Sequence, residues 1–155
     1  MLDLMRKPSR GQRGQTLVEF ALAALIFFTL ILGIVEFGRA LWTWNTIVEA
    51  TRAGARYAVV ETPTAANVKN YVVYYNAAGT GDPVLPGLSA SNVTVSFLKD
   101  DGTAATQTPP YDSDKVQVGI TGYTFNFLVP LFGSGITMPP FTTTLPVEGL
   151  GVIPP

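Results

Sequence analysis

The sequence predicts an α+β fold, in which a long N-terminal helix that can span a membrane continues into a small antiparallel β-sheet domain. Two patterns carry this prediction. Residues 20–35 are sixteen consecutive residues without a charge, which is typical of a membrane-spanning helix rather than of a helix with a polar face. Residues 93–97 and 116–120 alternate apolar and polar side chains, as strands with one buried face do.

The composition of the 155-residue chain argues against most kinds of catalysis. The chain has no histidine and no cysteine, so it lacks an imidazole base, a thiolate nucleophile and the ligands of a Cys/His zinc site. Carboxylates at 100–101 and 112–114 lack EF-hand spacing and are interpreted as turn residues. We therefore expect a structural or binding protein with no cofactor and no metal, and not an enzyme.

The charges divide at Gly14. Residues 1–14 hold four basic residues and one acidic residue, a net charge of +3, whereas the remainder holds six basic and ten acidic residues, a net charge of −4. Basic residues concentrate on the cytoplasmic side of a membrane-spanning helix, so we predict a cytoplasmic N-terminus and an extracytoplasmic α+β domain over residues 41–155. Four dispersed basic residues beside an apolar run do not indicate nucleic-acid binding.

Residues 17–38 are long enough to cross a bilayer. At about 1.5 Å per residue, these twenty-two residues reach roughly 33 Å, which exceeds the ~30 Å thickness of a hydrocarbon core. We predict a transmembrane helix over residues 15–40, with Trp42 and Trp44 either in the outer aromatic belt or in an ordinary core. A buried helix of a soluble protein and a cleaved secretory signal fit less well, because the apolar run is uncharged and too long for a signal.

The residues before the apolar run form a recognisable motif. Gly14 and Gln15 are followed by Glu19 and the aromatic Phe20. This motif resembles the prepilin-peptidase site of type IV pilins and pseudopilins. The resemblance implies cleavage after Gly14, removal of the basic leader 1–14, and pairing of Glu19 with the free amine of a neighbouring subunit's first residue. The alternative for Glu19 is that its carboxylate simply reaches the headgroups from the first helical turn.

A second motif follows the apolar run. It consists of Glu36 and Arg39 at the C-terminal end of the apolar run, followed by Arg52, Gly54 and Arg56. Together with the first motif, over about residues 13–60, it resembles the TadE-like family, minor pseudopilins of tight-adherence (Tad) pilus systems. The family usually has a proline near the position of Leu25, and its absence here predicts a straighter helix.

The resemblance implies a pilin-like layout, a location in the inner membrane and incorporation in a pilus used in adherence. It also implies three kinds of partner: a prepilin peptidase, other pilin or pseudopilin subunits, and inner-membrane pilus assembly proteins. The alternative function is that of an uncleaved, single-pass membrane protein whose β-rich outer domain binds a partner.

The segment after the apolar run has two helical faces. Small residues Ala50, Gly54 and Ala58 share one face with Ile47 and Thr51, while the other face is polar (Asn45, Glu49, Arg52 and Arg56). We predict one continuous helix over residues 15–60, whose small face allows close approach of another helix or a sheet and whose arginines are solvated.

The remaining elements are shorter. Pro63 ends the long helix and Thr64 caps a second one. Beyond the strand at 116–120, residues 123–129 continue the alternation in the other phase, which predicts a glycine bulge at Gly122 within one strand. The proline-rich end makes residues 141–147 an edge strand at best.

Overall fold

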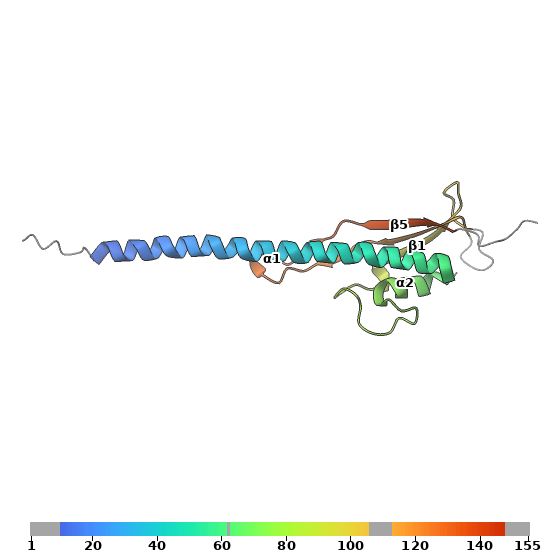
Figure 1. Ribbon diagram of the computed structural model, residues 1–155, viewed down its shortest axis with the longest axis horizontal. Helices are drawn as coiled ribbons and strands as arrows, with labels where there is room; N and C mark the ends of the chain where they lie inside the picture. The colour runs from blue at the N-terminus through green and yellow to red at the C-terminus, as the bar shows by residue number, and fades with distance from the viewer. Residues whose placement is uncertain (1–9, 62, 106–112, 148–155) are drawn as a thin grey trace, which may run out of the picture. The chain divides into compact units, whose positions relative to one another are not determined.

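The computed structural model describes residues 10–61, 63–105 and 113–147, with the backbone alone for residues 10–13 (Figure 1). The chain divides into two compact units, Met1–Gly38 and Arg39–Pro155. Most of the predicted leader, Thr62, Asp112 and the last prolines lie outside the described residues. The predicted fold class is confirmed, since a long apolar helix precedes a small antiparallel sheet.

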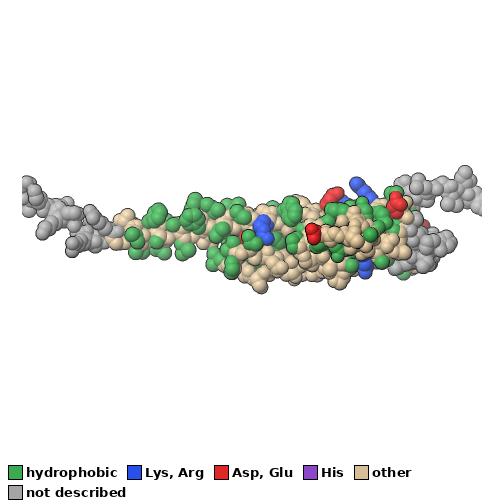
Figure 2. All heavy atoms as spheres, turned by 90° about the horizontal axis from the view of Figure 1, so that it is seen from below, with side chains coloured by type: hydrophobic (Ala, Val, Ile, Leu, Met, Phe, Trp, Pro, Cys, Tyr) green, Lys and Arg blue, Asp and Glu red, His purple; other side chains and the backbone are tan. Residues whose placement is uncertain are grey.

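The described part of the first unit, residues 10–38, is helical. Helix α1 (Arg10–Glu61) is a single α-helix of 52 residues and begins in this unit. Its large apolar side chains between Leu17 and Phe37 are exposed, and its most apolar 18-residue window has a mean hydropathy of 2.6 with none of the window buried. Figure 2 shows these hydrophobic side chains along the N-terminal half of α1. The helix is thus long and apolar enough to cross a membrane.

In the second unit, α1 has the two faces that the sequence predicts. Ile47, Ala50, Thr51, Gly54 and Ala58 are buried, which confirms the small face. The four residues of the polar face are exposed (Asn45, Glu49, Arg52 and Arg56). The arginines therefore lie on a solvated face, as expected.

Helix α2 (Ala65–Tyr74) begins at the predicted cap. The Thr64 hydroxyl accepts a hydrogen bond from the Asn67 backbone N–H at 3.4 Å, and Tyr75 ends the helix in a left-handed conformation (φ 52°). Val68 and Val72 point into the core, and the Tyr71 ring stacks on Tyr57 of α1 with 4.3 Å between ring centroids.

The approach of α2 to α1 depends on Gly54. A Cβ atom built at Gly54 would overlap Cγ2 of Val72 and lie 3.6 Å from Cγ1 of Val118 in the sheet. Only a residue without a side chain lets α1 pack this closely on Val72 of α2, whereas the distance to Val118 is that of an ordinary van der Waals contact.

The main sheet has three antiparallel strands. β1 (Val93–Leu98) follows a short 3₁₀ helix η1 (Ala90–Asn92), and the order is β1-β2-β5, with β2 (Lys115–Ile120) in the centre. β5 (Phe141–Pro146) lies at an edge, as the prolines predict. Its Thr143 hydroxyl donates to Thr51 of α1 at 3.3 Å.

The prediction of one strand with a bulge at Gly122 is wrong. β2 ends at Ile120, which pairs with Val93 at the start of β1, so β1 offers no partner beyond this point. Gly122 adopts a left-handed conformation (φ 67°), and the chain leaves the sheet there. A separate two-stranded hairpin follows, formed by β3 (Thr124–Phe125) and β4 (Ile136–Thr137) and enclosing the 3₁₀ helix η2 (Pro130–Phe132).

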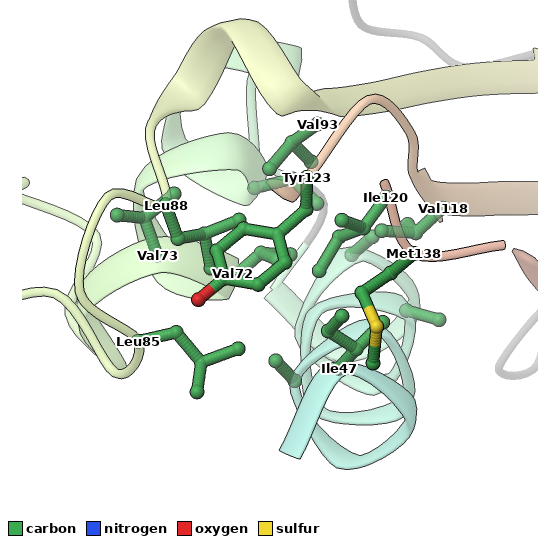
Figure 3. Packing of buried hydrophobic residues seen from close by; sticks show 14 of the residues in the cluster. Ile47, Val72, Val73, Leu85, Leu88, Val93, Val118, Ile120, Tyr123 and Met138 are labelled. Atoms are coloured by element: carbon green, nitrogen blue, oxygen red, sulfur yellow. The ribbon is translucent and has the colours of Figure 1, made fainter. Parts of the chain in front are cut away.

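The core of the second unit lies between α1, α2 and the sheet. Figure 3 shows Ile47 of α1, Val72 of α2 and Val118 of β2 in one cluster, with the Tyr123 ring reaching towards α2. The Tyr123 hydroxyl donates to the Pro86 carbonyl at 3.1 Å. Side chains from segments distant in the sequence therefore form a single apolar core.

The role of Gly54 can be tested by substitution. We expect Gly54→Ala to lower the free energy of unfolding by roughly 1–2 kcal/mol, because overpacking at Val72 outweighs the ~1 kcal/mol that alanine gains over glycine in a helix. Chemical denaturation of the full chain in detergent measures this. Gly38→Ala, where an added Cβ meets no atom within 4 Å, is the matched control and should cause no loss. Equal stability of the two variants would contradict the close approach.

Candidate functional site

The bond after Gly14 lies inside α1, close to its first residue, Arg10. Gly14 is exposed, and an added Cβ would meet no atom within 4 Å. The first backbone N–H groups of a helix have no acceptor within the helix, so its first turns open at little cost. The Gly14–Gln15 bond therefore lies in a part of the helix that an enzyme can unwind more readily than its middle.

Glu19 has a partner within its own helix. The Gln15 side-chain amide donates to Oε1 of Glu19 at 3.1 Å, across one helical turn. An ionised carboxylate in hydrocarbon costs about 2.5 kcal/mol or more, so a donor one turn away lowers the cost of placing Glu19 there. The structure thus brings together two of the residues that the sequence analysis singled out.

The aromatic residue after the carboxylate borders an apolar groove. Phe20 is 74% exposed and lines a groove of about 470 Å³ together with Ala23, Ala24, Phe27 and Phe28. The two alanines leave the helix backbone open to close approach, which is how helices pack in membranes. This face of α1 can accept an apolar helix or a lipid chain.

The other motif residues do not gather around Glu19. Glu36 is buried, and Arg39 lies with its guanidinium carbon 5.1 Å from the centroid of the Phe125 ring, a cation–π geometry. Gly54 is a packing residue, while Arg52 and Arg56 are solvated. The second motif therefore serves the structure of the second unit at Gly54 and Arg39.

The Arg39 contact belongs to a small pocket in the second unit. The pocket has a volume of about 170 Å³, and its lining includes Arg39, Trp42, Tyr123 and Phe125. Burial raises the pKa of the Tyr123 hydroxyl above its ordinary value. The sequence analysis missed this pocket, because nothing near Tyr123 in the sequence indicates contact with α1.

Trp42 and Trp44 differ in their surroundings. Trp42 is 62% exposed, whereas Trp44 packs edge-on against Phe141 of β5, with 5.7 Å between ring centroids. Among the described residues, no three side chains of the types His, Cys, Asp and Glu gather in a way that could hold a metal ion.

Over the part of the chain that the structure describes, these features are one helix able to span a membrane, an acid near the start of that helix, and a small sheet domain after it. A family model described as TadE-like protein matches residues 14–56, which confirms the TadE-like resemblance in α1. Such a match implies involvement in Tad pilus systems. No curated protein and no solved structure matches the chain.

The buried Tyr123 hydroxyl predicts the response of the second unit to alkaline pH. Since the folded-state pKa is raised above 10.0, the folded protein keeps this proton where the unfolded chain loses it. The stabilisation is present below about pH 10 and is lost as the pH rises further. The free energy of unfolding, measured by denaturation between pH 8 and 11, should therefore fall above pH 10. This fall should be shallower in Tyr123→Phe than in the wild type. Identical pH profiles for the variant and the wild type would contradict this.

Proposed function

We propose that this chain is a minor pseudopilin, cleaved by a prepilin peptidase after Gly14 and taking part in the assembly of a Tad-type pilus used in adherence. The single observation that carries the proposal is the spacing of Gly14, Glu19 and Phe20 at the start of an exposed apolar helix that matches the TadE-like model. The role is structural and requires no catalysis by the chain itself.

The charge distribution supports the orientation. The leader 1–14 carries a net charge of +3, which favours retention on the cytoplasmic side, where a prepilin peptidase would meet the Gly14–Gln15 bond. Residues 15–40 would then cross the inner membrane, and residues 41–155 would form the extracytoplasmic domain. Cleavage would remove four basic residues and leave Gln15 as the first residue.

Glu19 would act after cleavage. The new amine at Gln15 carries a positive charge at neutral pH, and a carboxylate in hydrocarbon requires a cationic or hydrogen-bonding partner. In the filament, Glu19 would pair with the amine of a neighbouring subunit's Gln15. The apolar groove at Ala23 and Ala24 would let the helix of that subunit approach. The partners are therefore other pilin or pseudopilin subunits and the inner-membrane assembly proteins.

Processing is tested by blocking the cut. We expect Gly14→Leu to abolish cleavage in the native host, because a bulky side chain would stand at the scissile bond. The intact mass of the membrane-extracted protein should retain residues 1–14 in this variant and lose them in the wild type. Gly11→Leu, a matched change three residues upstream, should still be cleaved. A wild-type chain that keeps its leader in a host containing the peptidase would favour the uncleaved membrane-anchored binding protein instead.

The assembly role of Glu19 is separable from processing. We expect the Glu19→Gln variant to be cleaved normally. Its amount in sheared pili should fall by a factor of about ten or more, because a neutral amide loses a charge pair worth about 1.4 kcal/mol or more in lipid. Glu49→Gln changes an exposed acid of the same helix and serves as the control. Quantitative immunoblots of pilus and membrane fractions measure the cleavage and the incorporation of each variant. Equal incorporation of the two variants would rule out an assembly carboxylate at Glu19.

A further inference from the structure

The β3–β4 hairpin presents large apolar side chains on its surface. Leu128 and Leu131 in its loop are 76% and 65% exposed, and Ile136 of β4 is also exposed. We call these three residues the hairpin patch. They lie within residues 116–147, a stretch of thirty-two residues with no acidic or basic side chain. Several large apolar side chains exposed on one hairpin, with no charged residue in the surrounding sequence, make this surface a candidate for an interaction.

The loop is held by aromatic packing beneath the patch. Phe127 contacts the Phe125 ring edge-on at 5.6 Å between centroids and lies 6.2 Å from the Phe132 ring. Gly135 approaches the hairpin backbone so closely that an added Cβ would lie 2.6 Å from the Phe125 carbonyl oxygen. The phenylalanines thus pack on one another while the two leucines point outwards.

The base of the hairpin lies beside the first residues of α1 in the second unit. The Arg39 guanidinium covers the Phe125 ring at 5.1 Å, and Trp42 lines the same pocket as Phe125 and Tyr123. Arg39 directly follows the apolar stretch 17–38 in the chain. Arginine and exposed tryptophan are typical of the boundary between hydrocarbon and headgroups.

We propose that the hairpin patch inserts into the outer headgroup and acyl boundary of the bilayer that α1 crosses, so that its partner is the lipid surface. The inference rests on the membrane anchoring of α1 proposed above. Lipid fits better than a protein partner, because the patch is uncharged and its base is linked to the residues at which the apolar stretch ends. Shallow insertion of leucine side chains needs no specific headgroup.

This contact gives the second unit another attachment to the membrane besides α1. A subunit that leaves the bilayer for a filament has to withdraw the patch as well as its apolar helix. The hairpin patch would therefore oppose the extraction of subunits that are not yet engaged by the assembly proteins.

The absence of cysteine from the chain permits a direct test. The full chain carrying Leu131→Cys is labelled with an NBD fluorophore and reconstituted in vesicles of phosphatidylethanolamine and phosphatidylglycerol, with and without doxyl-labelled lipid. Ala104→Cys is the matched control, because Ala104 is exposed and pairs with Leu98 at the end of β1 remote from Gly122. Phe28→Cys reports on the apolar stretch of α1 itself.

The proposal predicts that doxyl lipid removes most of the fluorescence at position 131 and at position 28, and leaves that at position 104 unchanged. Quenching at position 28 alone would overturn the hairpin contact while leaving the anchoring of α1 intact. An NBD group at position 131 that is shielded from water but not quenched by lipid would assign the patch to a protein partner and would also overturn the proposal. Absence of quenching at position 28 would refute the anchoring on which both proposals rest.

Discussion

The close packing of α1 against α2 at Gly54 is the interaction on which the second unit depends. Because Gly54 has no side chain, Val72 of α2 can reach the backbone of α1, and Val118 of β2 lies within ordinary contact distance of the same position. The neighbouring Thr51 is buried, yet its hydroxyl is satisfied, since it donates within the helix and accepts from Thr143 of β5. Small and polar residues on one helical face thus join elements that lie far apart in the sequence.

The same helix has different requirements before residue 39. Its apolar side chains there are exposed, and the acid near its start bonds to an amide one turn away. The hydrocarbon core of a bilayer would cover the exposed apolar side chains. The hydrogen bond from the amide lowers the cost of placing the carboxylate in lipid. Under the proposed function, cleavage would exchange this neutral partner for a charged amine on another subunit. One change at the N-terminus would then convert a membrane-anchored precursor into a subunit able to assemble.

Local patterns predicted the helices and the strands of the main sheet, but contacts over long sequence separations were not predictable. The cap at Thr64, the small face of α1 and the edge position of β5 each follow from a few adjacent residues. The departure of the chain at Gly122 depends on β1 starting opposite Ile120, which is a matter of register between distant strands. The Arg39–Phe125 contact likewise joins residues whose local sequences give no sign of each other. The Gly14 and Glu19 assignments came from a motif whose spacing is local.

Under the proposed function, Glu19 joins one subunit to the next through the amine exposed by cleavage after Gly14. Zero-length carbodiimide cross-linking of sheared pili, followed by mass spectrometry of the peptides, tests it directly. We expect an amide bond between the α-amine of Gln15 and the side chain of Glu19, found in covalent dimers and absent from cross-linked monomers. Sheared pili that contain the chain with Met1 still present, or dimers joined only through other residues, would show that Glu19 does not make this pairing.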